Sequence, residues 1–372
     1  MFQKIRLFAG KNPYIDRDDA YVRQLRKNVS FHMEHCESYA ELLRACGFHM
    51  DQLRSSDDVS HLPPLTTLYF KRNRLLSMPE RKLFLRATSS GTSGSKSQIG
   101  IDLPSFLIGV AMVARLFAYH HVISLRPVHY IMLGYEPNRQ SDLGAMKSAY
   151  GSTFFAPALS RTYALKATKS GYEPNPEGVK SALLKFAKAG TPVRLVGFPG
   201  YLMLLLRELE KDGVCLNLNK HSRIMLGGGW KQFTGEAVTP EQLYQLVEKR
   251  LGIPKERIHE FFSAAEHPLA YCKCKNGHFH VPAYSRVIIR DTVSMEPLPF
   301  GQPGLLNFVS PLVNSMPLVS VMTDDVAVLF AGESCGCGIQ TPYFQLLGRA
   351  GAQGIQTCSA TAAELAKGRD KA

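Results

Sequence analysis

A run of small polar residues is the first segment whose composition could do chemistry. Eight of the nine residues from Ser89 to Ser97 are serine, threonine or glycine, and the ninth is Lys96. The run is either a linker or a loop that binds something with its backbone. Because apolar segments flank it on both sides, a linker is the weaker interpretation. Converging backbone N–H groups and hydroxyl donors suit phosphate oxygens, although the pattern GxxxxGK[ST] does not fit.

The cysteines are the second group with chemical potential. Cys272 and Cys274 form one close pair, and Cys335 and Cys337 form another. The two pairs could meet in space and form one tetrahedral structural zinc site, although zinc sites more often use the spacing C-x2-4-C. The alternative is four ordinary thiols, some of them buried. Three histidines could replace a cysteine as zinc ligand: His267, His278 and His280.

Size and composition exclude several classes of protein. The 372 residues are 45% hydrophobic and 20% charged, as in an ordinary globular protein, and the net charge of +13 favours acidic partners. The basic residues are dispersed and no nucleic-acid-binding motif is present, so we expect no nucleic-acid partner. No apolar run reaches the roughly 18 residues of a membrane helix, and the N-terminus does not resemble a signal peptide. We therefore expect a cytoplasmic protein with reduced cysteines.

The chain alternates between segments typical of strands and of helices. Residues 16–46 have the apolar spacing of an amphipathic helix, and SFLIGVAMVARLFAYHHV predicts a buried helix. HYIMLGY (129–135) and PVRLVGF (192–198) are typical of buried parallel strands, and strands predominate after about residue 280. This order predicts an α/β fold with layered parallel or mixed sheets. The serine-rich loop follows the strand KLFLRA, and ligands bind at the carboxyl ends of strands in such folds.

The loop and four later segments resemble, in the same order, the adenylate-forming enzymes, the superfamily of the acyl-CoA synthetases and firefly luciferase. SSGTSGSKS resembles the phosphate loop of that superfamily. LGGGWK (226–231) resembles its glycine-rich adenine-side segment, and FFSAAE (261–266) resembles its aromatic segment ending in glutamate. MTDD (322–325) is similar to its Thr-Gly-Asp segment, and LGR (347–349) to its hinge.

The resemblance implies roles for individual residues. Glu266 would hold Mg²⁺ beside the phosphates of ATP, Asp325 would bind the ribose hydroxyls, and Arg349 would contact the ribose or a phosphate. Lys96 stands one place earlier than the family's lysine and is the catalytic candidate of the loop; Ser263 and Asp324 stand where the family has glycines. The remaining residues that the resemblance assigns to ATP are Ser89, Ser90, Gly91, Thr92, Ser93, Gly94, Ser97, Gly227, Gly228, Gly229 and Ala265.

Further segments resemble one branch of this superfamily, the acyl-protein synthetases that ligate fatty acids to protein in bacterial bioluminescence. These include LPPLTTLYFK, LGYEP, HFHVPAYSRVIIRD and LLGRAGAQGIQTCSATAAELA. In that family a cysteine near the C-terminus accepts the acyl group, and Cys358 is at the matching place. Without the resemblance, Cys358 would be interpreted as a small buried residue. The phenylacetate–CoA ligases are the nearest other relatives.

The domain organisation implied by the resemblance has a reduced C-terminal part. Only 23 residues follow Arg349, so we expect an adenylate-forming domain over 1–347, with a strand-rich part at about 267–345, and a short lobe or tail over 348–372. A mobile tail could carry an acyl group on Cys358. Positive charge would favour its thiolate, and the candidates by position are Arg349, Lys367 and Arg369.

The function implied is an ATP-dependent acyl-protein synthetase. It would activate a carboxylic acid, with a fatty acid favoured, pass the acyl group to Cys358 and then to a protein such as an acyl reductase or acyl carrier. One alternative is an acid–CoA or acid–carrier-protein ligase without an acyl-cysteine intermediate. The other is a non-catalytic relative that binds a nucleotide or nucleic acid. We expect the acid pocket around residues 129–135, 195–201 and 226–230.

Overall fold

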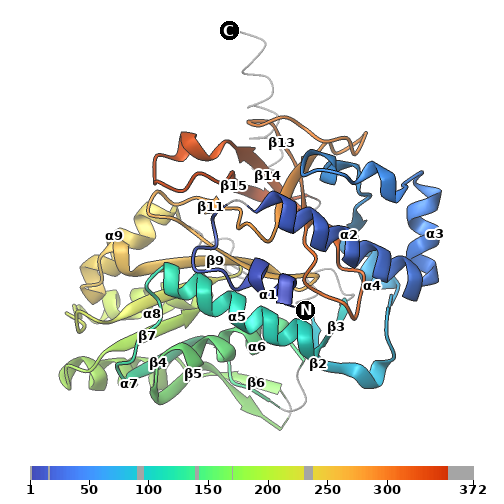
Figure 1. Ribbon diagram of the computed structural model, residues 1–372. Helices are drawn as coiled ribbons and strands as arrows, with labels where there is room; N and C mark the ends of the chain where they lie inside the picture. Colours follow the sequence, from blue (N-terminus) through green and yellow to red (C-terminus); the bar gives the residue numbers. More distant parts are fainter. Residues whose placement is uncertain are drawn as a thin grey trace. The chain divides into compact units, whose positions relative to one another are not determined.

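Figure 1 shows the computed structural model of the chain. Its residues form two compact units. Unit 1 comprises residues 1–119 and 264–372, and unit 2 comprises residues 120–263. The proposed boundary at residues 347/348 stays a prediction, because the description of the chain ends at residue 350. The residues that the structure describes are 2–15, 17–89, 96–138, 142–169, 171–229 and 238–350.

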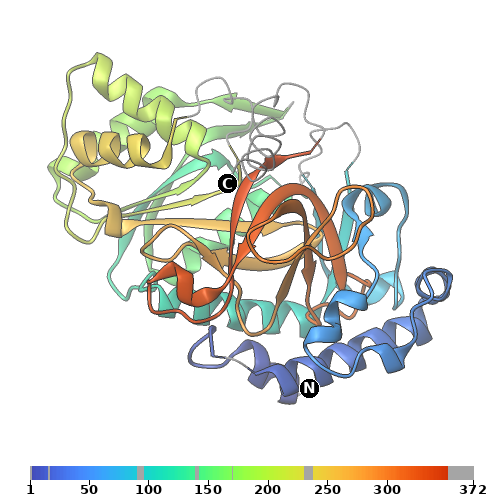
Figure 2. The same cartoon turned by 90° about the horizontal axis from the view of Figure 1, so that it is seen from above.

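The amino-terminal part of unit 1 contains two helices where the sequence predicts one over 16–46. Helix α2 (Asp18–His35) and helix α3 (Glu37–Ala45) are separated at Cys36, whose backbone is extended. The apolar face of α2 is buried, and the Tyr21 hydroxyl donates a hydrogen bond to the Val309 carbonyl oxygen at 3.0 Å. This contact places α2 along the strands of unit 1, as Figure 2 shows in blue and orange-red. The other helices of unit 1 are α1 (Phe2–Phe8), α4 (Thr67–Arg72) and α5 (Leu103–Tyr119).

The main sheet of unit 1 contains the strand-rich part predicted after residue 280. Its order is β11-β15-β14-β13-β12, all antiparallel, and β1 pairs parallel to β14. The central strands β13 and β14 are buried at consecutive positions over much of their length, so apolar side chains cover both of their faces. The strand bounds are β1 Leu65–Thr66, β11 Phe279–His280, β12 Arg286–Arg290, β13 Pro303–Val309, β14 Ser320–Phe330 and β15 Tyr343–Arg349. A further strand of unit 1, β10 (His267–Cys272), is not part of this sheet.

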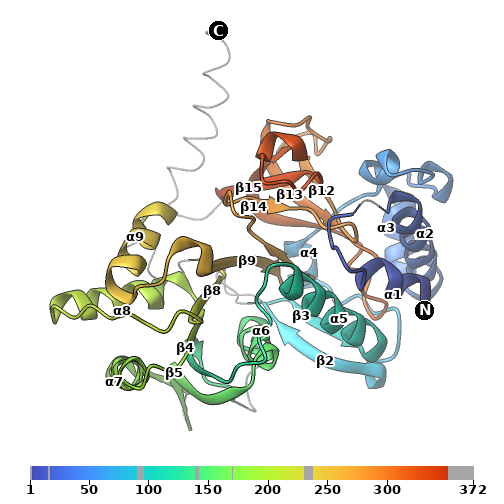
Figure 3. The same ribbon diagram turned by 60° about the vertical axis from the view of Figure 1, so that its left-hand side comes forward.

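The strand before the serine-rich loop differs from the prediction. KLFLRA does form a strand, β2 (Leu83–Thr88), but it pairs only with β3 (Gln98–Asp102), antiparallel, in a two-stranded sheet. The loop therefore joins two strands of a hairpin and does not follow a strand of a parallel sheet. Helix α5 packs against this hairpin (Figure 3). It is less buried than predicted, because Leu103, Leu107 and Val110 are exposed.

Unit 2 is the predicted α/β layer. Its sheet has the order β9-β8-β7-β4-β5-β6, and every pair is parallel except β5 with β6. The two segments predicted as buried parallel strands are the neighbours β4 and β7. The strand bounds are β4 Val128–Tyr135, β5 Ala158–Thr168, β6 Gly171–Pro174, β7 Val193–Gly197, β8 Arg223–Gly227 and β9 Ile258–Ala264.

Three helices of unit 2 begin with proline, which suits the first helical position because its missing N–H needs no partner there. They are α7 (Pro176–Lys188), α8 (Pro199–Lys211) and α9 (Pro240–Leu251). Their apolar faces pack on one face of the sheet around Leu195 and Ile224 and form the core of the unit (Figures 1 and 3). Helix α6 spans Gly144–Ser152. Within the described part of the chain, no helix has the length and apolar character needed to cross a bilayer.

Candidate active site and metal cluster

The base of the serine-rich loop is closed by hydrogen bonds between Ser89 and Ser97. The Ser89 N–H donates to the Ser97 carbonyl oxygen at 3.2 Å, and the Ser97 N–H donates to Ser89 Oγ at 3.0 Å. The buried hydroxyl of Ser97 donates to Oε1 of Glu266, which is also buried. The structure therefore brings the loop and the predicted magnesium ligand together, although they lie 169 residues apart in the sequence.

The predicted ribose residues form an ion pair. Asp325 on β14 and Arg349 on β15 are partners in the antiparallel register, and Arg349 Nε donates to Asp325 Oδ1 at 2.9 Å. Burial lowers the pKa of Arg349, but the charges of Asp325, Asp324 and Glu266 outweigh burial and raise it. The pair connects the segments MTDD and LGR, which the sequence assigned separately to the nucleotide.

Two residues that the sequence did not single out hold the neighbouring Asp324. Thr67 Oγ1 donates to Asp324 Oδ1 at 3.3 Å, and the Lys71 ammonium lies 3.9 Å from Oδ2. The Ala350 N–H donates to the Asp324 carbonyl oxygen at 2.7 Å. Asp324, which stands where the superfamily has glycine, thus fixes β14 to helix α4 and to the segment after Arg349.

The glycines assigned to the adenine lie in unit 2, at the carboxyl end of β8. Gly227 is the last residue of that strand. Gly228 has a φ angle of +74°, a left-handed backbone conformation that residues other than glycine rarely adopt. This backbone requirement explains why the turn after β8 contains glycine.

The other predicted nucleotide residues are only partly described. Lys96 is exposed and Ala265 is half-buried, directly before Glu266. Ser90, Gly91, Thr92, Ser93 and Gly94 lie outside the described residues, as do Cys358, Lys367 and Arg369. Their predicted roles stay predictions.

The two cysteine pairs meet in unit 1, with one change of ligand. Sγ of Cys274, Cys335 and Cys337 and a ring nitrogen of His280 all lie within 4.8 Å of one another. Cys274 Sγ is 3.6 Å from Cys335 Sγ, and Cys337 Sγ is 3.2 Å from His280 Nε2. Zinc–sulfur bonds of about 2.3 Å in tetrahedral geometry place two sulfurs about 3.8 Å apart, so this spacing fits zinc. The donor set of three thiols and one imidazole fits zinc equally well.

The remaining predicted metal ligands lie outside this four-atom group. Cys272 directs its Sγ to the Lys273 carbonyl oxygen at 3.6 Å. His267 is a buried core residue that stacks on Phe308 and contacts the Tyr271 hydroxyl at 2.8 Å. His278 comes closer, because its Nδ1 lies 3.1 Å from Cys335 Sγ. Of the three histidines, His280 thus occupies the position predicted for Cys272.

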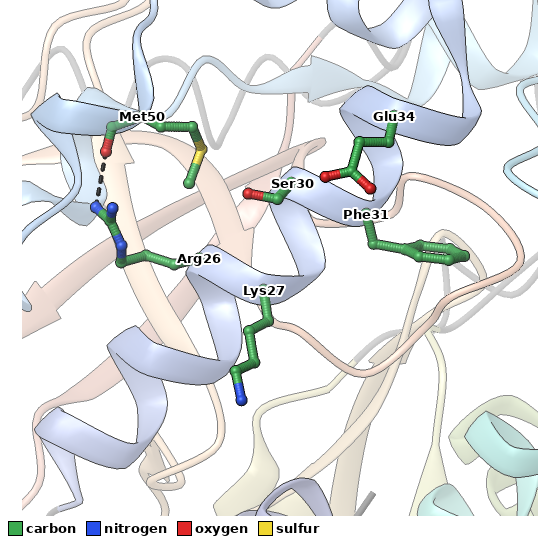
Figure 4. Close-up of a pocket in the computed structure, with 6 residues that line it drawn as sticks. All are labelled: Arg26, Lys27, Ser30, Phe31, Glu34 and Met50. Carbon is green, nitrogen blue, oxygen red and sulfur yellow. Dashed lines mark hydrogen bonds between the residues drawn. The ribbon is translucent and has the colours of Figure 1, made fainter.

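A surface pocket on helix α2 has no connection with these residues (Figure 4). Arg26 spans one side of it and donates to the Met50 carbonyl oxygen at 2.7 Å. None of the predicted nucleotide or metal residues lines this pocket, whose lining consists of Arg26, Lys27, Ser30, Phe31, Glu34 and Met50.

Comparisons of the sequence and structure with known proteins support the enzyme class that the predicted nucleotide residues indicate. The sequence model of the family described as "Acyl-protein synthetase, LuxE" matches residues 14–366. The chain belongs to this family. The chain is 24% identical over 284 residues to the long-chain-fatty-acid–luciferin-component ligase of Vibrio harveyi, and this match covers 73% of this chain and 70% of that protein. It is also 24% identical over 324 residues to the phenylacetate-coenzyme A ligase of Pseudomonas putida, covering 84% and 66% of the two chains.

Solved structures show that the chain has the fold of the adenylate-forming enzymes. An open conformation of 2-hydroxyisobutyryl-CoA ligase, in complex with its acyl-adenylate and CoA, matches with a TM-score of 0.67 and 17% identity. The match covers 90% of this chain and 70% of that chain. Family and fold together identify an ATP-dependent, AMP-forming acid ligase, as the ordered segments predicted.

Proposed function

We propose that this acid ligase activates a fatty acid as its acyl-adenylate and transfers the acyl group to Cys358 as a thioester. The observation that supports activation most directly is the contact between Ser97 and Glu266, because it joins the phosphate loop to an acidic residue in a buried environment. Family membership over residues 14–366 supports the transfer to protein.

The first step is nucleophilic substitution at the α-phosphorus of ATP. A carboxylate oxygen of the acid forms a P–O bond, the bond between the α-phosphorus and the bridging oxygen breaks, and pyrophosphate leaves. The backbone N–H groups of the loop would stabilise the charge that develops on the phosphate oxygens. Asp325 would accept hydrogen bonds from the two ribose hydroxyls, and Arg349 would hold its carboxylate in place.

Magnesium fits the residues at the base of the loop. Glu266 and Ser97 present a carboxylate and a hydroxyl in contact, and magnesium prefers such hard oxygen ligands. Bound there, Mg²⁺ would neutralise negative charge on the phosphates of ATP.

The second step transfers the acyl group. The Cys358 thiolate attacks the carbonyl carbon of the acyl-adenylate, a C–S bond forms, and AMP leaves with the electrons of the C–O bond. The thioester keeps the acyl group reactive, so that a nucleophile on a partner protein can accept it. The acceptor would be an acyl reductase or an acyl carrier.

The runner-up is an acid–CoA or acid–carrier-protein ligase without an acyl-cysteine intermediate. The similarity to phenylacetate-coenzyme A ligases supports it. The two candidates share the first step and differ only in the second, so that the behaviour of a Cys358 variant separates them.

Replacing Asp325 with asparagine should weaken ATP binding. The variant loses charge-assisted hydrogen bonds to the ribose, worth roughly 1.5–3 kcal/mol each, so we expect the KM for ATP to rise at least about tenfold. Steady-state pyrophosphate release at varied ATP concentration measures it. Asp57→Asn, a change on the exposed surface of unit 1, serves as control. An unchanged KM in Asp325→Asn would contradict the ribose role.

We further propose that Cys274, His280, Cys335 and Cys337 bind a structural zinc ion. The four donors come from two segments of unit 1, so one ion would join β11 to the turn before β15. Thiols stay reduced and available to metal in a cytoplasmic setting, which we propose for this protein.

Elemental analysis of the purified protein should find one zinc per chain, and Cys335→Ser should lower the content well below one. A chelator should lower the thermal midpoint by several degrees, because a structural zinc contributes folding free energy. Cys272→Ala is the matched control and should retain the metal, since Cys272 lies outside the group. Loss of zinc in Cys272→Ala with retention in His280→Gln would refute the ligand set.

A further inference from the structure

Basic side chains lie side by side at the amino-terminal ends of three neighbouring strands of unit 2. Arg194 on β7 is the register partner of Arg223 on β8, and His259 on β9 is the partner of Met225. Because side chains alternate along a strand, Arg194, Arg223 and His259 project from one face. It is the face opposite to Leu195 and Ile224, which belong to the helix-covered core.

Arg194 is a buried charge without a counter-charge. Its side chain is among the largest that are fully buried, with 1% exposed. Nη2 donates to the Val122 carbonyl oxygen at 2.6 Å, and the guanidinium also interacts with the Tyr130 phenol, whereas Nε and Nη1 make no hydrogen bond of good geometry with the described residues. Guanidinium groups do not lose their proton in proteins, and buried charges are normally paired. In the part of the chain that the structure describes, neither Arg194 nor Arg223 forms an ion pair with a carboxylate.

Arg223 adds a second positive charge, whereas the other polar groups around Arg194 are neutral. Arg223 Nη1 lies 3.2 Å from His259 Nε2, so this nitrogen accepts and the neutral imidazole has its proton on Nδ1. Burial lowers the pKa of His259 to about 3, and Arg223, His120 and Arg194 lower it in the same direction. Burial also raises the pKa of Tyr130, the register partner of Arg194, and outweighs the lowering effect of the charge and hydrogen bond of Arg194, so this phenol stays neutral and is not the missing anion.

We propose that Arg194, Arg223 and His259 bind a small oxyanion of the phosphate class, which supplies the missing negative charge. The donors present are guanidinium N–H groups and an imidazole N–H, a set that recognises phosphate oxygens. The burial of Arg194 favours inorganic phosphate over the phosphate group of a larger molecule. Arg223 and Gly227 are the two ends of β8, about 13 Å apart at 3.3 Å per residue, so this site is separate from the adenine-side glycines.

Phosphate titration of the full chain tests this site. In a buffer free of phosphate, with a non-hydrolysable ATP analogue occupying the nucleotide loop, we expect saturable binding of one inorganic phosphate per chain by calorimetry. At a phosphate concentration about 100-fold above Kd, the thermal midpoint should rise by roughly 3–4 °C relative to sodium chloride of equal ionic strength. Arg194→Met should abolish this rise, and O-phosphoserine should bind more weakly than phosphate.

Two further measurements separate an anion site from a structural arginine. Without phosphate, Arg194→Met should be at least as stable as the wild type, because removing an unpaired buried charge relieves its desolvation cost. Arg223→Met should also lose the phosphate response, whereas Lys249→Met, an exposed change on α9 of equal charge, should keep it. Three results would overturn the proposal. The first is a rise of the thermal midpoint with phosphate that is no larger than with chloride, and the second is a rise that persists in Arg194→Met and Arg223→Met. The third is an Arg194→Met variant that is less stable than the wild type in the absence of phosphate.

Discussion

Cys358→Ser should lose the covalent acyl label while the chain continues to activate the acid. Incubation of the wild type with labelled fatty acid and ATP should leave label on the protein that hydroxylamine releases, as expected of a thioester. In the serine variant the label should fall at least about a hundredfold, because an alcohol at neutral pH is a far weaker nucleophile than a thiolate. Exchange of pyrophosphate into ATP should stay within about twofold of the wild type, since it reports only the first step.

The matched control is Cys46→Ser, which removes an exposed thiol at the C-cap of α3, far along the chain from the family's acyl-accepting position. It should keep both the label and the exchange reaction. If Cys358→Ser makes acyl-CoA as fast as the wild type when CoA is supplied, and the wild type carries no label, then the acid–CoA ligase is the correct assignment.

Glu266→Gln should have the second large effect, on the first step. The amide keeps the size of the side chain and can still accept the hydrogen bond from Ser97, but it removes the negative charge that would hold Mg²⁺. Losing about 3 kcal/mol of transition-state stabilisation corresponds to a rate reduction of about a hundredfold. The measurement is acid-dependent pyrophosphate exchange at saturating ATP, repeated over a range of Mg²⁺ concentrations.

A thermal midpoint close to that of the wild type would show that Glu266→Gln acts on chemistry and not on folding. Glu256→Gln, an exposed change of the same kind, should leave the exchange rate unaltered. Exchange within threefold of the wild type in Glu266→Gln would remove this residue from the proposed site.

Local sequence patterns predicted helices, strands and single site residues. They did not predict which side chains become neighbours when distant strands pair. The segments ending in Asp325 and Arg349 could be assigned one by one. Their ion pair depends on the register of β14 with β15, which no local pattern reveals. Lys71 was missed for a similar reason. The strand β1 that places it beside Asp324 has two residues and therefore no detectable periodicity.

The cluster of Cys274, His280, Cys335 and Cys337 also depends on strand pairing that local sequence patterns do not predict. The sequence correctly indicated that two cysteine pairs could meet, yet proximity in sequence favoured Cys272 over His280. In the structure Cys272 ends β10 with its sulfur directed to a backbone carbonyl, whereas β11 pairs with β15 and brings His280 to the three other ligands. The break between α2 and α3 at Cys36 was likewise not evident, because the apolar spacing continues across it.

Acid-dependent exchange of labelled pyrophosphate into ATP, measured over a panel of carboxylic acids, distinguishes adenylate formation from other ways of activating an acid. We expect exchange that requires both an acid and Mg²⁺, is fastest with a fatty acid and yields AMP when pyrophosphate is removed. The absence of exchange with every acid, or the formation of ADP and phosphate in place of AMP and pyrophosphate, would contradict an adenylate-forming reaction.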